Sequence, residues 1–379
     1  MFDLNNLIAQ LQQIGSGSIT DFCIIDGNIW SLDQVEIMSL NEYAEHTFYS
    51  MPLKFYKYFP NTDKDGTNYS LLALESNEVY LSNPCDFDDV FDSEISVQWE
   101  EFEAYRIKTY ASWARCHLNP NMSLEDTANV LLQCLFDLVQ KGEDIENAFD
   151  MKAYEELEKL QAREFVLRLK LEQANHDMGT ALKNVITKEY ELFIEDLKNI
   201  FRISCFTTAP MSQLMWGGSY ANEHRGFCLE YTVIPSQEYE DILHNIRPVI
   251  YSKKRHPVTR ALLDAHDKNW SIPALRDLYL NGALRKSIDW AYQNEWRLLL
   301  PPQTHGQKGF TKKFFPITKV YLGNRMPADK RKEIITICKR KGIPYIGVTR
   351  SLELYEMQEC KDLCENCLWL NNLGINKKV

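Results

Sequence analysis

The sequence lacks the features that would place the chain in a membrane or outside the cell. It has no run of about 18 or more apolar residues, the length that a membrane-spanning helix requires. Its first residues, Met-Phe-Asp-Leu-Asn-Asn, do not have the basic-then-apolar order of a signal peptide. The ten cysteines are scattered, and a chain of this size needs no disulfides, so we predict reduced thiols. We therefore expect a soluble, cytoplasmic protein without a membrane partner.

The sequence also lacks an excess of positive charge. It has 42 Lys and Arg residues against 53 Asp and Glu residues, and its formal net charge is −11. Nonspecific nucleic-acid binding depends on neutralising phosphates, so this charge disfavours it without excluding a local basic site. The basic clusters at 253–256 and 330–341 are more typical of solvated helix or loop faces.

Two groups of metal-ligating residue types are incomplete as motifs. Asp86, Asp88, Asp89 and Asp92 lie within seven residues, but the segment lacks the glycine and terminal glutamate of a calcium loop. Turns and helix caps explain these aspartates better.

Cys360, Cys364 and Cys367 have the spacing C-x3-C-x2-C, which could begin a zinc or iron–sulfur site. The same spacing places three thiols on one face of a helix, where they act as small apolar groups. Because no fourth ligand lies nearby in the sequence, the helical interpretation is favoured.

The order of the predicted elements indicates an α+β fold with a mixed, mostly antiparallel sheet core and a large helical insertion. Strand patterns occupy 53–58, 78–81, 201–206, 226–234, 246–251, 295–300, 317–322, 345–348 and 352–357. Helical patterns occupy 258–266, 272–285 and 328–341. We divide the chain into 1–98 and 201–357, the two parts of the core, 99–200, the helical insertion, and 358–379, a cysteine-containing helix or tail.

The insertion carries the clearest helix signals. Ser123 to Asp126 resembles a capping box. The segment 152–173 repeats apolar residues at helical spacing, namely Leu157, Leu160, Phe165, Leu167 and Leu171. Residues 99–200 could carry a partner or dimer surface, or could pack against the parent domain.

The polar stripe in the segment 290–297 is the strongest functional signal. On a strand, Gln293, Glu295 and Arg297 would point to one face and Trp296 to the other. A strand facing a core should not carry such a stripe, and the aromatic residues at 290, 292 and 296 suggest a pocket wall. The alternative is a solvent-exposed Glu–Arg pair, worth at most about 1 kcal/mol.

Two upstream segments supply further candidates. Trp216, Tyr220 and His224 recur at spacing four, so a helical turn would place them on one side, beside the Gly217–Gly218 pair. A structural histidine is the alternative there. Farther upstream, Lys57 alternates with tyrosines on a predicted strand, where it would face either a ligand or solvent.

These segments, taken in order, resemble the bacterial family called domain of unknown function 2971. The matching segments are Tyr56 to Tyr58, Asp88 to Asp92, Cys205 to Thr207, Met215 to Cys228, and Trp290 to Arg297. The resemblance covers about 53–95 and 200–357. The chain departs from the family pattern in the aspartate turn, which lacks the expected Asn and Pro. It also has Gly218 or Ser219 in place of a histidine, and Gln293 in place of a glutamate.

The resemblance suggests an arrangement like that of the ADP-ribosyltransferase fold, with NAD as substrate. It implies that Glu295 stabilises the oxocarbenium charge that develops when the nicotinamide–ribose bond breaks, while Gln293 orients the nucleophile. Tyr220 or Trp216 would stack on nicotinamide, and Lys57 or His224 would hold the pyrophosphate or the adenosine ribose. Tyr58 and Arg297 complete the implied cofactor-binding set.

The resulting hypothesis is an NAD-dependent ADP-ribosyltransferase-like enzyme, such as a toxin or phage-defence effector, that modifies a protein or a nucleic acid. Two alternatives stay open. One is a non-catalytic module that binds or senses a nucleotide or a partner. The other is a metal-dependent nuclease that uses the four aspartates and Glu295.

Overall fold

The computed structural model describes residues 22–87, 89, 91–93, 96–140, 149–255, 257, 259, 263, 278–304 and 306–360. The chain divides into two compact units, each with its own internal contacts. Unit 1 comprises 1–94, 198–255 and 278–379, and unit 2 comprises 95–197 and 256–277. Most of the predicted helix at 258–266 lies outside the described residues, as do residues 272–277, Asp88, Cys364 and Cys367. The described part of the predicted helix at 272–285 is helical only over Leu278–Ala283, and Arg285 begins a strand instead of ending the helix.

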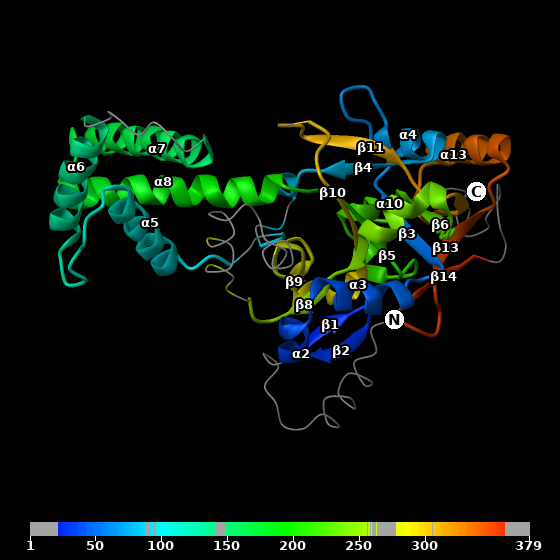
Figure 1. Ribbon diagram of the computed structural model, residues 1–379. Helices are drawn as coiled ribbons and strands as arrows, with labels where there is room; N and C mark the ends of the chain where they lie inside the picture. The colour runs from blue at the N-terminus through cyan, green and yellow to red at the C-terminus, as the bar shows by residue number, and fades with distance from the viewer. Residues whose placement is uncertain are drawn as a thin grey trace. The chain divides into compact units, whose positions relative to one another are not determined.

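The described strands of unit 1 form two sheets (Figure 1). The larger sheet contains β3 (Lys54–Phe59), β4 (Glu78–Ser82), β5 (Arg202–Thr207), β6 (Phe227–Thr232), β7 (Ile246–Pro248), β10 (Glu295–Leu300), β11 (Gly309–Lys313), β12 (Ile317–Leu322), β13 (Tyr345–Arg350) and β14 (Met357–Glu359). Its order is β11-β4-β5-β3-β6-β12-β13-β14, and β10 joins β5 to β7. The pairing is antiparallel except between β12 and β13.

The smaller sheet has the order β2-β1-β8-β9. Its strands are β1 (Phe22–Ile25), β2 (Asn28–Ser31), β8 (Ile250–Ser252) and β9 (Arg285–Ser287). Only the pair β8–β9 is parallel in this sheet. The predicted α+β class with mixed strands is therefore confirmed.

Short helices connect the strands of unit 1. They are α2 (Leu32–Ile37), α3 (Leu40–Tyr49), α4 (Tyr69–Ser76), α9 (Gln213–Gly217), α10 (Glu240–Asn245) and α13 (Ala328–Lys341), with single turns η2 (Pro84–Asp86), η3 (Ser219–Ala221), η4 (Gln237–Tyr239), η5 (Leu278–Ala283) and η6 (Ile288–Gln293). Local sequence sets their ends: Ser39 and Glu42 form a capping box at the start of α3. Gly342, with φ +68°, ends α13 in the left-handed region that glycine tolerates.

A large buried apolar cluster of unit 1 lies on one face of the larger sheet. Phe55, Phe206 and Trp296 belong to one buried cluster, and the rings of Phe206 and Phe314 stack at 4.2 Å between centroids. The side chains that alternate with these on β5 and β10 point to the opposite face. That opposite face carries the polar residues discussed below.

Two strand predictions were wrong. The predicted strand at 246–251 breaks at Val249, so that β7 pairs with β10 in the larger sheet and β8 pairs with β1 in the smaller one. A continuous apolar segment cannot reveal such a break, because both halves are buried. The segment 352–357 is a series of bends, and β14 begins only at Met357.

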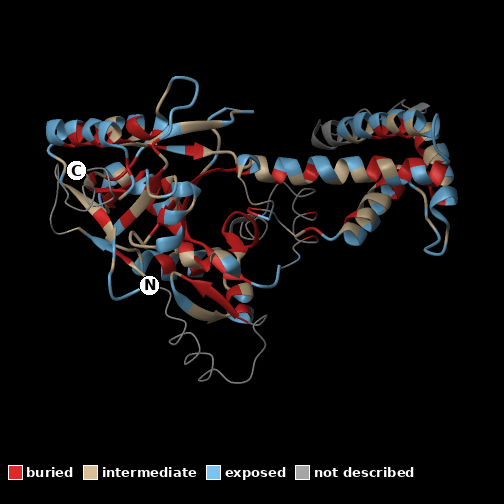
Figure 2. Cartoon of the chain, turned by 180° about the vertical axis from the view of Figure 1, so that it is seen from behind, coloured by how far each residue is buried: buried red, intermediate tan, exposed pale blue. Residues whose placement is uncertain are grey.

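Unit 2 is helical in its described part, with α5 (Trp99–Trp113), α6 (Leu124–Gln140), α7 (Phe149–Gln173) and α8 (Met178–Asn199). As predicted, Ser123 caps α6, since its Oγ accepts from the Asp126 backbone N–H at 3.1 Å. Buried and exposed residues alternate along these helices (Figure 2). None of the helices in the described ranges combines the length and apolar character needed to cross a membrane.

The apolar face of α7 differs from the one that the spacing suggested. Of the five apolar residues that defined the helix, only Phe165 is buried. Ala162, Val166 and Leu169 share its buried face. The exposed fractions of the other four are between 52% and 72%, for Leu157, Leu160, Leu167 and Leu171. A partner or dimer surface in this region stays a prediction.

Candidate functional site

Strand β10 carries the predicted polar stripe. Glu295 and Arg297 share one face, and Trp296 points to the opposite face, where it is fully buried in the core. Gln293 is not on the strand: it ends η6, and Asn294 follows with a left-handed φ of 41°. The turn nevertheless keeps the Gln293 side chain beside that of Glu295, because both accept from the same ammonium group.

Two residues of this stripe, Glu295 and Arg297, form a closed ring of four charged side chains together with Asp92 and Lys286. Arg297 contacts Asp92 at 2.8 Å and Glu295 at 2.7 Å, and Lys286 contacts each of the two carboxylates at 3.1 Å. Positive and negative groups alternate around the ring, so each charge has two neighbours of opposite sign. No side chain in it is more than 7% exposed. The alternative of a solvent-exposed Glu–Arg pair is therefore wrong.

Arg297 also satisfies its remaining donors in this buried position. Its Nη1 donates to Ser93 Oγ at 3.0 Å and to the Ala283 carbonyl at 2.7 Å. The guanidinium fork matches several acceptors at once, which a lysine ammonium could not do in the same geometry. Arg297 is thus a structural anchor that holds Glu295 and Asp92 in place.

The ring keeps Glu295 and Lys286 ionised. Burial alone opposes the charge on Glu295, but the neighbouring charges of Arg297 and Lys286 outweigh burial and hold the pKa of the Glu295 carboxyl well below its usual range. Burial likewise opposes the charge on Lys286, and Glu295 and Asp92 raise the pKa of that ammonium. Glu295 is therefore a permanent carboxylate at neutral pH and not a general acid.

We expect stability to fall in acid through Glu295. Its folded-state pKa lies below the unfolded value of 4.5, so its contribution is complete above pH 4.5 and is lost as the pH falls toward the folded pKa. Urea denaturation at several pH values between 3 and 7 would measure this. In a Glu295→Gln variant this part of the acid dependence should disappear, and an unchanged slope would contradict the assigned ionisation.

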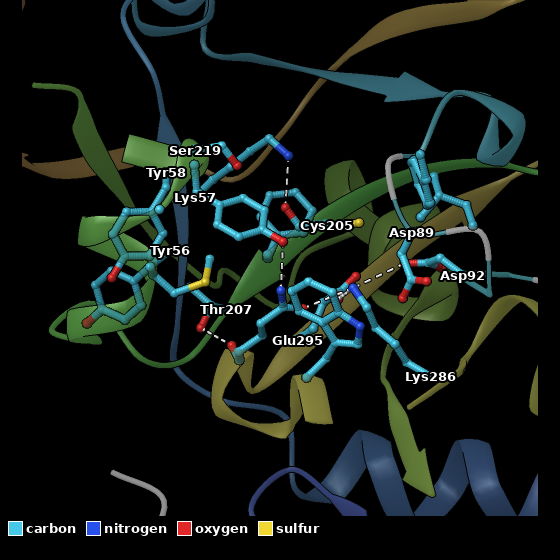
Figure 3. Close-up of a pocket in the computed structure, with 18 of the residues that line it drawn as sticks. Tyr56, Lys57, Tyr58, Asp89, Asp92, Cys205, Thr207, Ser219, Lys286 and Glu295 are labelled. Carbon is cyan, nitrogen blue, oxygen red and sulfur yellow. Dashed lines mark hydrogen bonds and ion pairs between the residues drawn. The ribbon is translucent and has the colours of Figure 1, made fainter. Parts of the chain in front are cut away.

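A cavity of about 570 Å³ opens above the ring (Figure 3). Much of its wall is aromatic, formed by Tyr56, Tyr58, Tyr80, Phe87, Phe206, Tyr220, Trp290 and Tyr292. Glu295, Gln293, Lys286 and Asp92 line its polar side. Concave sites with aromatic walls and a few convergent polar groups are the usual form of small-ligand sites.

Lys57 lines the cavity next to the point where β3 pairs with β5, at Tyr56 and Thr207. Its ammonium donates to the Cys205 carbonyl at 2.8 Å and to Ser204 Oγ at 3.2 Å. Burial lowers the pKa of Lys57. Its hydrogen-bond partners are uncharged, in contrast to those of Lys286.

Three of the residues predicted to bind a cofactor do not line the cavity, namely Trp216, His224 and Arg297. Trp216 is fully buried, and its indole donates to the Pro210 carbonyl at 2.8 Å. His224 has a φ of 69°, and its backbone N–H donates to the Trp216 carbonyl at 2.8 Å. The predicted single helical turn was wrong, because α9 ends at Gly217 and η3 begins a new turn.

Lys286 is the main site residue that the sequence pattern missed. It lies next to a predicted helix and carries no motif of its own. β9 is only three residues long and owes its position to its parallel pairing with β8. Among the described residues, no three His, Cys, Asp or Glu side chains are placed to hold a metal ion.

The chain is an α+β protein with an aromatic cavity above a buried ionic ring. Residues 215–298 match the family model described as "Protein of unknown function (DUF2971)". The match confirms the family resemblance for this segment, which includes Tyr220, Lys286, Gln293, Glu295 and Arg297. No curated protein and no solved structure matches the chain. The likeness to the ADP-ribosyltransferase fold therefore stays a prediction.

Proposed function

We propose that the chain is an NAD-dependent ADP-ribosyltransferase-like enzyme whose reaction takes place in the aromatic cavity. One observation carries the proposal: a carboxylate that is ionised at neutral pH, Glu295, lies on the polar side of a cavity with aromatic walls. Aromatic faces suit a planar base, and the ionised carboxylate suits a developing positive charge.

The charges of the cavity agree with a cationic ring as ligand. Among the described residues that line it, four are carboxylates and two are lysines: Asp86, Asp89, Asp92, Glu295, Lys57 and Lys286. The nicotinamide ring of NAD is a flat cation, which aromatic faces and an excess of carboxylates both attract. Lys57, with its uncharged partners, would meet the pyrophosphate.

The reaction would proceed as follows. The bond between the nicotinamide nitrogen and ribose C1 breaks, nicotinamide leaves with the electron pair, and C1 becomes electron-deficient. Glu295 stabilises that charge. Its oxygens accept one bond each from Lys286 and Arg297, and the Cys205 thiol also contacts the carboxylate, which leaves one acceptor position for the ribose hydroxyl. An oxygen or nitrogen of the protein or nucleic-acid target, or of water, then attacks C1 and loses its proton to solvent water.

The direct test is incubation of the purified protein with NAD, alone and with candidate targets. Nicotinamide release would be measured by chromatography, and transfer would be measured with ADP-ribose labelled on the adenine. Release above the buffer rate supports the proposal. NAD left intact in every mixture contradicts it.

A second candidate is a non-catalytic module that binds a nucleotide or a partner. The observation in its favour is that both oxygens of Glu295 already take part in ion pairs, as in a purely structural network. Calorimetry with NAD separates the two candidates, because the module would bind NAD without turnover.

A further inference from the structure

Hydrogen bonds fix the orientation of the Gln293 side-chain amide next to the cavity. A lysine ammonium can only donate, and Lys286 donates to Gln293 Oε1 at 3.0 Å. The amide oxygen of Gln293 therefore faces Lys286, and its NH₂ group faces the cavity side. That group donates to the Tyr220 hydroxyl oxygen at 2.7 Å. The ionic ring thus determines which way the amide points.

The orientation of the Gln293 amide restricts the direction of the Tyr220 hydroxyl proton. Because its oxygen accepts from Gln293, its own proton must point elsewhere, and Tyr220 lines the cavity with 38% of its surface exposed. Within the described part of the chain, the Tyr220 hydroxyl donates no hydrogen bond to another residue. Burial raises the pKa of Tyr220 to about 12, so the hydroxyl keeps its proton at neutral pH.

We propose that Tyr220 is a ligand-binding residue that donates a hydrogen bond to an uncharged carbonyl oxygen, with Gln293 and Lys286 as positioning residues that set its direction. A carbonyl fits better than an anion, because the carboxylates around the cavity outnumber its lysines. The inference rests on the proposed function in one respect: in NAD, the carboxamide of nicotinamide supplies this carbonyl.

The test compares two dinucleotides, NAD and the same molecule with an unsubstituted pyridinium ring. Both carry a cationic ring and the same phosphates, so the ratio of their dissociation constants isolates the carboxamide. Calorimetry on the full chain should show NAD binding about 3- to 10-fold more tightly, as expected for one net hydrogen bond. The 3-acetylpyridine dinucleotide, which keeps the carbonyl but lacks the amide NH₂, should bind like NAD.

Two variants should reduce this ratio to about one. Tyr220→Phe removes the donor and keeps the ring. Gln293→Glu keeps the shape but presents a carboxylate to Tyr220, so that the hydroxyl proton turns toward residue 293 and away from the ligand. Tyr69→Phe is the control, since it removes a hydroxyl from an exposed tyrosine that does not line the cavity and should leave the ratio unchanged. If Gln293→Glu fails to fold, the ratio measured for Tyr220→Phe still tests the inference.

The outcomes separate this inference from the proposed function. A ratio near one in the wild type, or an undiminished ratio in Tyr220→Phe, overturns the inference even if NAD is cleaved. A ratio above one that Tyr220→Phe abolishes supports the inference even if NAD is never cleaved. Failure of both dinucleotides to bind overturns the inference and also removes NAD as the ligand.

Discussion

Replacing Glu295 by glutamine is expected to lower the rate of nicotinamide release about 100- to 1,000-fold, the usual effect of removing one group that stabilises transition-state charge. The substitution keeps the shape of the side chain but removes its negative charge. Since that charge acts mainly on the transition state, kcat should fall while KM for NAD changes little. Steady-state kinetics of nicotinamide release would measure both constants.

Glu230→Gln is the matched control for this variant. Glu230 is also a buried carboxylate on a strand of the larger sheet, where it accepts from Lys54, Thr318 and Tyr321. It does not line the cavity. We expect this variant to lose stability but to keep its rate. Equal losses of rate in both variants, or an unchanged rate in Glu295→Gln, would remove Glu295 from the mechanism.

Replacing Arg297 by methionine is expected to destabilise unit 1 by about 3–5 kcal/mol, because it leaves buried carboxylates without their main partner. Arg297 is fully buried and is the guanidinium link between Asp92 and Glu295. Urea denaturation of the variant and the wild type would measure the difference in the free energy of unfolding.

The matched control for Arg297 is an ion pair on the surface. Arg225 contacts Glu223 at 2.6 Å, with side chains 44% and 64% exposed. Solvent screens such a pair, so Arg225→Met should change stability by less than about 1 kcal/mol. Comparable losses in the two arginine variants would show that burial of the ring does not determine its energy.

Patterns along the chain were sufficient for most elements and for part of the site. Residue composition identified β3, β5, β6, β10 and β12 as strands, although β5, β6 and β10 are buried on both faces. Side chains alternate between the two faces of any strand. The same alternation showed that Glu295 and Arg297 share a face. Capping at Ser123 and the 3.6-residue period identified the helices of unit 2. Periodicity did not show which face of α7 is buried, since apolar residues occur on both faces.

The composition of the ionic ring could not be predicted in this way. Arg297 and Asp92 are 205 positions apart in the sequence, and no local pattern joins them. Asp92 belonged to a run of aspartates that turns and helix caps explained better than a binding site, and Lys286 carried no signal at all.

In the segment Trp290 to Arg297, the local sequence determined some features and the tertiary structure determined others. Local sequence alone determined that it contains a strand with a polar stripe on one face and Trp296 on the other. Only the tertiary structure decided that the stripe is buried, that Lys286 and Asp92 close a ring with Glu295 and Arg297, and that Gln293 donates to the Tyr220 hydroxyl. The reason is physical: strand periodicity follows from neighbouring residues, whereas burial and charge pairing depend on segments that only folding brings together.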